Sequence, residues 1–371
     1  MQRLVWTSHF RLNCRVDGLA KPAPDGAVHW FRAIFNVTLS APLPGAGPVR
    51  IPGSPARHQS NLLTFWGIPC LVFPLEIRYR SVMLTALRHV WRHPLNANGR
   101  LSGIGRFARW QIATRLLPGS AVAIPFTDRA RLLVSRGMYG ATQNVYCGLN
   151  DFEDMSFLVH YLRQDDVFVD VGANIGAYTV LAGAVAGARA YAFEPSPAAL
   201  HSLRDNLALN YISGRVSIEP YAAGRAPGSV PISTGGPSAM HHIEPGSPPS
   251  SSMVEMRTID SYDLRPAIMK IDVEGYEAEV LAGAMETATS HELVAIITEN
   301  SDDSDKYGDG ILSVTAFMSH HGFTAVTYDP WQRRIHPKHK RSDNTLYIRD
   351  IAKAQQRVAE AAPFRVLGRS I

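Results

Sequence analysis

The most chemically informative part of the chain is a glycine-containing turn after an apolar run. Residues 167–171 read Val-Phe-Val-Asp-Val and lead into Gly172-Ala-Asn-Ile-Gly176, which a helical pattern follows. Gly172 permits a sharp turn and the close approach of a ligand, and Gly176 lets the start of the helix pack against the strand. Asn174 can hydrogen-bond across the turn. This succession of strand, turn and helix predicts a site for a nucleotide-like ligand.

An acidic residue lies where a second contact to such a ligand is expected. Glu194 ends the run Ala190-Tyr-Ala-Phe-Glu and lies 22 residues after Gly172. A carboxylate at the end of the second strand can accept hydrogen bonds from both hydroxyls of a ribose. The spacing Asp170-x-Gly172-x-x-x-Gly176 differs from the G-x-G-x-x-G of turns that hold a pyrophosphate, which the acidic residue at the end of the strand would also repel. A cationic sulfonium and its amine suit such a residue, so S-adenosylmethionine fits better than a nicotinamide dinucleotide.

Further carboxylates follow two later apolar runs. Asp272 and Glu274 come directly after residues 268–271, and Glu299 comes directly after residues 293–298. The carboxyl ends of parallel strands meet at the edge of an open α/β sheet where ligands bind. Methyl transfer to a hydroxyl needs an in-line approach and the removal of the hydroxyl proton. Asp272 is therefore the first candidate for the general base, and Glu274 is the second.

Two alternatives remain open for the chemistry at this edge. His241 and His242 lie in a loop rich in Gly, Pro and Ser, and an imidazole that reached over the pocket could serve as the base, which makes His242 a third catalytic candidate. Asp272, Glu274 and Glu299 could together hold a divalent cation, because hard oxygen ligands suit magnesium. No metal ligand is assigned.

The elements that must position these residues show a regular alternation. From Asp165 onward short apolar runs alternate with helical patterns, which indicates a parallel sheet with crossover helices. Seven strands are expected, at Val167–Val171, Ala190–Phe193, Val216–Ile218, Ile268–Ile271, Leu293–Thr298, Thr324–Tyr328 and Thr345–Ile348. Helices are expected at Ile175–Ala186, Pro197–Leu209, Tyr276–Met285 and Ile311–His320. Two further strands, Ser229–Ser233 and Met253–Arg257, flank the histidine-bearing loop.

Five motifs follow one another in order between about residues 140 and 300. They are Asp170-Val-Gly-Ala-Asn-Ile-Gly176, Phe193-Glu-Pro-Ser-Pro197, Asn206-Leu-Ala-Leu-Asn210, Thr258-Ile-Asp260, and Met269-Lys-Ile-Asp-Val-Glu-Gly-Tyr-Glu277 with Val280-Leu-Ala-Gly-Ala284. Together they resemble the FkbM-type class I methyltransferases. The resemblance implies an α/β Rossmann-like class I methyltransferase fold with a seven-stranded, mostly parallel sheet whose last strand is antiparallel. It also implies S-adenosylmethionine-dependent O-methylation, commonly of sugar or polyketide hydroxyls.

Site roles follow for the residues of the first two motifs. Asp170 and Gly172 are expected to contact the methionine portion of S-adenosylmethionine. Asn174 and Gly176 are expected to shape the turn. Glu194 is expected to bind the ribose diol, with the alternative that it only caps the following helix.

Charge divides the chain into two unlike parts. Of its 371 residues, residues 1–150 hold 18 Lys and Arg against 4 Asp and Glu, whereas residues 151–371 hold 19 against 28. This asymmetry excludes a uniform polyanion binder. The expected organisation is a Pro- and Gly-rich, poorly ordered and dispensable extension at 1–82, a helical preface at 83–164, a methyltransferase domain at 165–350 and a C-terminal tail at 351–371. Amphipathic helices are expected at residues 82–91 and 104–117 of the preface.

The spacing of the cysteines and the hydropathy of the chain indicate the cellular compartment in which the protein is expected. Cys14, Cys70 and Cys147 are widely spaced, which predicts neither a disulfide framework nor a zinc site and fits the cytoplasm. The most apolar window, residues 62–77, contains Gly67 and two prolines and is too short to predict a transmembrane helix.

The leading prediction is a cytoplasmic S-adenosylmethionine-dependent methyltransferase that acts on a hydroxyl of a saccharide or secondary metabolite. One alternative is an RNA methyltransferase in which the basic region Arg88–Arg136 tracks phosphates and Trp91 and Trp110 stack on bases, although no nucleic-acid partner is expected. A nicotinamide-dependent oxidoreductase is disfavoured by the glycine spacing. A non-catalytic protein that binds the cofactor, or a partner of the membrane surface through its basic helices, is a further alternative. The sequence does not identify the acceptor or the oligomeric state.

Overall fold

A computed structural model describes residues 83–233, 251–299, 314–338 and 344–371. All of these residues belong to one compact unit. The expected extension at 1–82 and the loop that carries His241 and His242 lie outside the described residues. Among the helices that are described, none is long and apolar enough to cross a membrane.

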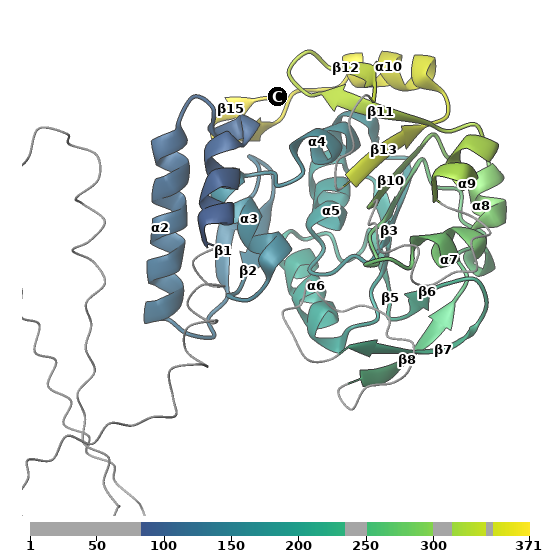
Figure 1. The fold of residues 1–371 in the computed structure, drawn as a ribbon, viewed down its shortest axis with the longest axis horizontal. Helices are drawn as coiled ribbons and strands as arrows, with labels where there is room; N and C mark the ends of the chain where they lie inside the picture. The colour runs from purple at the N-terminus through teal and green to yellow at the C-terminus, as the bar shows by residue number, and fades with distance from the viewer. Residues whose placement is uncertain (1–82, 234–250, 300–313, 339–343) are drawn as a thin grey trace, which may run out of the picture. The chain divides into compact units, whose positions relative to one another are not determined.

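An eight-stranded sheet forms the centre of the described fold (Figure 1). Its order is β12-β11-β13-β10-β9-β3-β4-β5. The strands are β3 (Val167–Val171), β4 (Arg189–Phe193), β5 (Val216–Glu219), β9 (Ile268–Ile271), β10 (Ala295–Glu299), β11 (Thr324–Asp329), β12 (Arg334–Pro337) and β13 (Asn344–Ile348). Strands β5, β4, β3, β9 and β10 pair in parallel, and β13 runs antiparallel to both β10 and β11. The expected α/β fold class is therefore confirmed, and β12 adds an eighth strand as a hairpin with β11.

Helices cover both faces of this sheet (Figure 1). One face carries α4 (Phe152–Tyr161), α5 (Ala177–Val180), the π-helical turn η3 (Leu181–Ala186) and α6 (Pro197–Leu209), and the other carries α7 (Glu277–Ala282), α8 (Met285–Thr289) and α9 (Val314–His320). Neighbouring residues of β3 enter different cores: Phe168 packs with Leu203 of α6, and Val169 packs in the core that contains Val280 of α7. This alternation follows from the pleat of a strand whose two faces are both buried.

Two predicted helices are interrupted. The helix expected at Ile175–Ala186 is a short α-helical turn that continues as η3, and the one expected at Tyr276–Met285 is split between α7 and α8. Gly283 lies at the split, where a Cβ would come within 2.0 Å of the Gly224 carbonyl oxygen. Gly224 follows β6 (Ala222–Ala223), which forms a separate three-stranded sheet with β8 (Ser251–Arg257) and β7 (Gly228–Ser233).

The preface is not wholly helical, contrary to the expectation. It comprises a helix at residues 83–92, η2 (Pro94–Asn96), α2 (Arg100–Leu116), a hairpin of β1 (Val122–Pro125) and β2 (Arg131–Val134), and α3 (Tyr139–Cys147). The strands β1 and β2 have four residues each and pair with each other. Their sequence pattern is too short to predict a strand. The α2 pattern is also imperfect, because Phe107 and Trp110 are buried while Ile112 and Leu116 are exposed.

Two asparagines of α6 hold this hairpin. Asn206 Oδ1 accepts a hydrogen bond from Leu133 N at 2.6 Å, and its Nδ2 donates to Ile175 O at 2.9 Å. One helical turn later, Asn210 Oδ1 accepts from Arg131 N and Nδ2 donates to Arg131 O, both at 2.8 Å. The spacing of the Asn206-x-x-x-Asn210 motif thus matches two backbone sites on β2 and ties the preface to the sheet.

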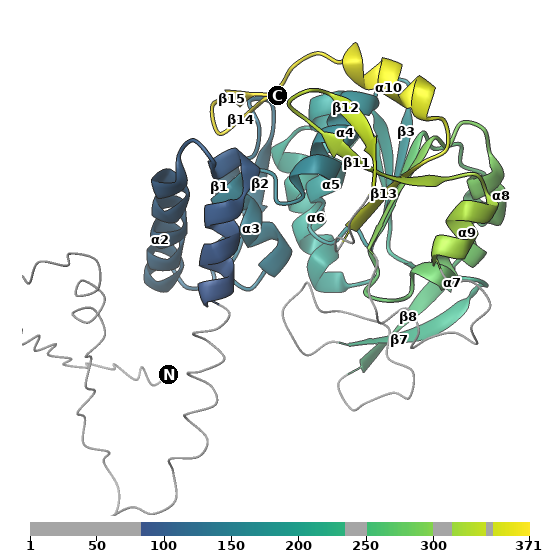
Figure 2. The same ribbon diagram turned by 45° about the horizontal axis from the view of Figure 1, so that its top comes forward.

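The C-terminal residues fold back onto the preface. After α10 (Ile351–Ala359), the strands β14 (Arg365–Val366) and β15 (Arg369–Ser370) form a hairpin near β1 and η2 (Figure 2). Arg365 N donates to Asp128 Oδ1 at 3.0 Å, and Arg369 Nη1 donates to Pro94 O at 3.0 Å. Val366 fills the space beside Gly148, where a Cβ would lie 2.6 Å from its side chain. The expected tail is therefore packed structure.

We predict that Asn206→Ala lowers the free energy of unfolding by about 2 kcal/mol, because it leaves the buried Leu133 N–H and Ile175 carbonyl without their partner. Urea denaturation measures this. Ser202→Ala, one turn earlier on α6 and only partly buried, is the control and is expected to change little. Equal losses in the two variants would contradict the role given to Asn206.

Candidate active site

A cavity of about 1830 Å³ lies at the carboxyl edge of the central sheet. Its sheet-side wall includes Asp170, Gly172, Asn174, Glu194, Lys270, Asp272, Glu274 and Glu299. Its other walls include His89, Gln111, Asn144, Asp151 and Asp154 from the preface and the start of α4. Pockets for one small ligand usually measure about 300–1,000 Å³, so this cavity has room for a cofactor and an acceptor together.

Three residues of the turn after β3 adopt left-handed backbone conformations. The φ angles are 76° at Gly172, 52° at Asn174 and 85° at Gly176. A Cβ at position 172 would lie 1.9 Å from the carbonyl oxygen of Asp272, so this glycine lets the turns after β3 and β9 meet. The prediction for Gly176 was wrong in its partner: a Cβ there would lie 2.4 Å from Leu203 of α6, so the glycine accommodates the neighbouring helix and not the strand.

Two oxygen atoms in this turn are buried and unpartnered among the described residues. They are Asp170 Oδ1 and Asn174 Oδ1. The second oxygen of Asp170 accepts a hydrogen bond from Thr179 Oγ1 at 2.6 Å, and burial raises the pKa of this carboxyl group. Because both residues line the cavity, a ligand with a cationic amine would satisfy these oxygens. The turn therefore fits the amino-acid end of S-adenosylmethionine.

Glu194 combines the two roles considered for it. Its Oε2 accepts a hydrogen bond from Asn174 N and its Oε1 accepts one from Ser196 N at the start of α6, both at 2.8 Å. The hydrogen bond across the turn is thus made by the Asn174 backbone and not by its side chain. Burial raises the pKa of Glu194 to about 7, against the effect of the two N–H groups. Each carboxylate oxygen can accept more than one hydrogen bond, so both remain able to receive a ribose hydroxyl.

Lys270 is a site residue that the sequence interpretation missed. Its side chain is 4% exposed in the middle of β9, and Nζ donates to Asp272 Oδ2 at 2.7 Å. Nζ also lies 4.8 Å from the centre of the Tyr178 ring. Burial opposes the charge of the ammonium, but the carboxylates of Asp272 and Asp170 outweigh it and raise the pKa of Lys270. A lysine inside the apolar run Ile-Met-Lys-Ile was the signal that could have found it.

Two aspartates at the start of α4 were also missed. Tyr178 Oη donates to Asp151 Oδ2 at 3.0 Å, which links α4 to the helix after β3. Burial raises the pKa of Asp154 to about 7, and the neighbouring charges of Asp151 and Glu153 add to the shift. Both aspartates line the cavity. Both aspartates precede β3 in the chain. The sequence around them has no pattern indicating that this segment lies beside the carboxyl end of β3, where the cavity is.

The structure brings together the predicted carboxylates after β9 and β10. Oxygen atoms of Asp272, Glu274 and Glu299 lie within 4.8 Å of one another. Glu274 has a left-handed φ of 55°, and Glu277 Oε1 holds this strained turn by accepting from Val273 N and Gly275 N at 3.1 Å. Burial, followed by repulsion from Asp272 and Glu274, raises the pKa of Glu299 to about 8. Glu299 is therefore a hydrogen-bond donor at neutral pH.

Trp91 and Trp110 of the preface differ in their exposure. Trp110 is 6% exposed and belongs to the core. Trp91 is 42% exposed, but the Arg100 guanidinium lies 5.2 Å from its ring centre. Trp110 is thus not available to a nucleic-acid base, which removes one of the two side chains on which the RNA alternative relied.

In the central sheet, β5, β4, β3, β9 and β10 run parallel and β13 runs antiparallel, with a cavity at the carboxyl edge, which agrees with the class I methyltransferase fold expected from the sequence. Residues 170–325 match the family model of the methyltransferase FkbM domain. These residues form an FkbM-type methyltransferase domain, as the motifs predicted, and this class implies S-adenosylmethionine as the cofactor.

Two curated relatives and one solved structure illustrate the similarity. Hexuronic acid methyltransferase AglP of Haloferax volcanii is 30% identical over 151 residues, which are 38% of this chain and 58% of that protein. The 31-O-demethyl-FK506 methyltransferase FkbM of Streptomyces tacrolimicus is 29% identical over 216 residues, which are 47% of this chain and 80% of that protein. A methyltransferase FkbM from Methylobacillus flagellatus is 20% identical with a TM-score of 0.36, over 50% of this chain and 44% of that one.

We predict that Lys270→Met lowers the free energy of unfolding by about 3 kcal/mol at pH 8, because it leaves the carboxylates of Asp170 and Asp272 without a neighbouring positive charge. At pH 5 the loss is expected to be smaller. Without the cation, which lowers the pKa of Asp170, the pKa of this carboxyl rises further in the folded state. The folded variant then binds more protons than the unfolded one and loses stability as the pH rises.

Thermal and urea unfolding at both pH values measure this effect. Lys353→Met, on the exposed surface of α10, is the matched control. A loss that is independent of pH would show that Lys270 acts by packing alone.

Proposed function

We propose that this chain transfers the methyl group of S-adenosylmethionine to a hydroxyl of a saccharide or a secondary metabolite. The observation that carries the proposal is one cavity lined both by the turn after β3 and by the carboxyl groups that follow β9 and β10. The sheet supplies Asp170, Asn174 and Glu194 on the cofactor side. The preface and the turns after β9 and β10 supply the acceptor side.

The cofactor side is proposed to act as follows. Asp170 Oδ1 and Asn174 Oδ1 receive the amino group of the methionine portion, because both are buried without another partner among the described residues. Glu194 accepts the two ribose hydroxyls. When bound there, S-adenosylmethionine supplies an electrophilic methyl group.

The acceptor side is proposed to orient a hydroxyl and remove its proton. The bond from the acceptor oxygen to the methyl carbon forms as the carbon–sulfur bond breaks, its electron pair stays on sulfur, and the hydroxyl proton passes to a carboxylate. Asp272 is the proposed base: Lys270 fixes its Oδ2 at 2.7 Å, and its backbone contacts Gly172 of the cofactor turn. Glu274 is the second candidate. Glu299, protonated at neutral pH, donates a hydrogen bond to another acceptor oxygen.

The acceptor class rests on the polar lining of the cavity. Gln111, Asn144, Asp151 and Asp154 line the part of the cavity beyond the cofactor turn, and amide and carboxyl groups suit a molecule with several hydroxyls. The two relatives are named for a hexuronic acid and for 31-O-demethyl-FK506. This chain spans 58% of the length of the first, so its acceptor is proposed independently of that name.

The cofactor proposal predicts that the chain binds S-adenosylmethionine and S-adenosylhomocysteine but not NADH. Glu194→Gln is expected to weaken the binding of both sulfur ligands roughly 10–100-fold, because charged hydrogen bonds contribute about 1.5–3 kcal/mol. Protonation of Glu194 removes its charge and part of its capacity to accept hydrogen bonds from the ribose hydroxyls. Binding to the unaltered chain therefore weakens as the pH falls below about 7, the pKa of Glu194. Glu194→Gln removes this dependence.

Isothermal titration calorimetry between pH 5.5 and 8.5 measures these affinities. Glu219→Gln, at the end of neighbouring β5 and outside the cavity lining, is the matched control. Tight binding of NADH without binding of either sulfur ligand would overturn the methyltransferase proposal, and an unchanged affinity in Glu194→Gln would overturn the role of this residue.

The base proposal predicts that Asp272→Asn lowers kcat by about 10²–10⁴-fold while the affinity for S-adenosylmethionine changes little. The readout is release of S-adenosylhomocysteine with glucuronic acid and neutral hexoses as acceptors. Asp154→Asn is the comparison, because its pKa of about 7 would also suit a base. A loss of kcat, and of the acidic limb of the pH profile, in Asp154→Asn but not in Asp272→Asn would move the base to α4.

A further inference from the structure

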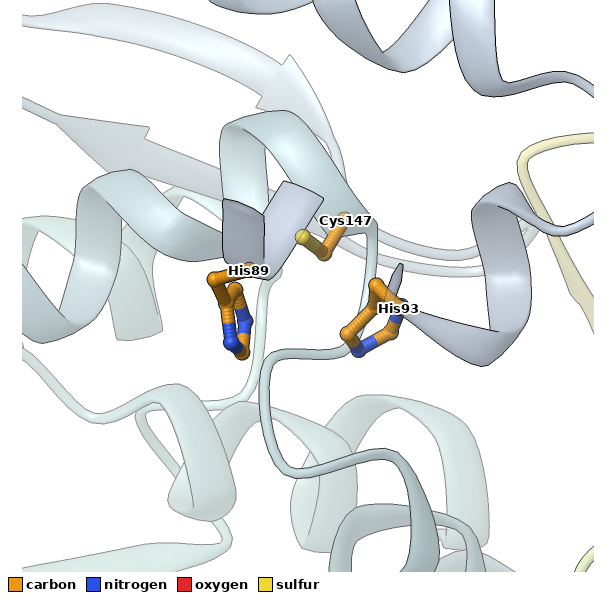
Figure 3. A group of neighbouring side chains, drawn as sticks. All are labelled: His89, His93 and Cys147. Atoms are coloured by element: carbon orange, nitrogen blue, oxygen red, sulfur yellow. The ribbon is translucent and has the colours of Figure 1, made fainter. Parts of the chain in front are cut away.

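His89, His93 and Cys147 form a cluster beside the cavity, which His89 and His93 line (Figure 3). His89 lies on the helix at residues 83–92, His93 follows that helix directly, and Cys147 ends α3. One ligand atom from each residue lies within 4.8 Å of the others. His93 and Cys147 are buried at 4% and 0% exposure, and His89 is partly buried.

The hydrogen bonds of this cluster leave it incompletely satisfied. His89 Nε2 is buried and has no hydrogen-bond partner among the described residues. The Cys147 sulfur has one weak contact, to Asn96 Nδ2 at 3.9 Å, and that amide already donates to Val90 O at 2.9 Å. Buried polar atoms of globular proteins are normally paired, so these two point to a group that completes the cluster.

The His93 ring is oriented as a metal ligand is. Leu95 N can only donate, so His93 Nδ1 accepts its hydrogen bond at 3.3 Å, and the ring proton is on Nε2, 3.2 Å from Asn150 O. A ligating histidine typically donates its second ring N–H to a backbone carbonyl in this way. Nδ1 is then the coordinating atom, and ligation replaces the long hydrogen bond from Leu95.

We propose that His89, His93 and Cys147 bind a borderline-soft divalent transition metal, of which Zn²⁺ is the best fit. Imidazole and thiolate are the ligands that zinc prefers, at about 2.0–2.1 Å and 2.3 Å. Tetrahedral zinc places its ligand atoms about 3.5 Å apart, so the cluster closes by a movement of about 1 Å or less. Since His89 and His93 line the cavity and Cys147 does not, the fourth position faces the cavity and is filled by solvent.

Binding requires the Cys147 thiolate, and its proton leaves to solvent as the sulfur–metal bond forms. Burial raises the pKa of the free thiol to about 12, whereas the positive charge of Arg106 acts in the opposite direction. The metal itself supplies the remaining charge that the thiolate needs. Such a site would join the helix at residues 83–92 to α3 independently of any methyl transfer.

The experiment loads the full chain, freed of metal by a chelator, with Zn²⁺ or Co²⁺ alone. We expect about one tightly bound zinc per chain by elemental analysis, a higher melting temperature with zinc, and the near-ultraviolet sulfur-to-cobalt charge-transfer band with Co²⁺. Cys147→Ser abolishes the band, and His89→Gln abolishes tight binding. Circular dichroism of the metal-free variants checks that each one folds.

Matched controls separate this site from other sulfur and imidazole groups. The double variant Cys14→Ser/Cys70→Ser is expected to keep the charge-transfer band, and His201→Gln, whose side chain is 81% exposed on α6, is expected to keep tight zinc binding. Absence of the band in the unaltered chain overturns the proposal, and so does equal zinc binding in Cys147→Ser. Neither result bears on S-adenosylmethionine binding, which is measured separately.

Discussion

The positive charge of Lys270, buried in the central strand β9, is the constraint on which the active-site edge depends. Its ammonium contacts Asp272 directly and opposes the raised pKa of Asp151, Asp154, Asp170 and Glu299. In each of these carboxyl groups burial is the largest contribution and Lys270 offsets part of it. A cluster of this many acids can be packed at one sheet edge because one cation lies within it and because some of the acids remain protonated.

This uneven protonation gives the edge two kinds of carboxyl group. Glu299, with a pKa of about 8, holds a proton at neutral pH, and Glu194 and Asp154 titrate near pH 7. Groups that lie close together therefore differ in whether they donate or accept hydrogen bonds. That difference is what a transfer reaction to a hydroxyl requires, since one oxygen of the acceptor has to lose a proton while others are held.

The sequence predicted the catalytic half well because each of its elements follows from local rules. All seven strands of the expected sheet are present, including the antiparallel β13, and Asp170, Glu194, Asp272 and Glu299 lie at its carboxyl edge. The hairpin β1–β2, the return of residues 365–371 and the entry of Asp151 into the cavity depend on contacts between residues far apart in the chain. No periodicity encodes such contacts. Likewise, sequence patterns that indicate zinc have closely spaced ligands, whereas Cys147 lies 54 residues from His93, the nearer histidine of its cluster.

The return of the C-terminal hairpin has a consequence for how the chain folds during synthesis. Arg365 and Arg369 bind Asp128 and the carbonyl of Pro94, across 237 and 275 residues. These hydrogen bonds close long loops of the described fold, and a ribosome must translate the whole central sheet before they can form. Asp128 and Pro94 of the preface therefore lack these partners until 237 and 275 further residues, respectively, have been translated.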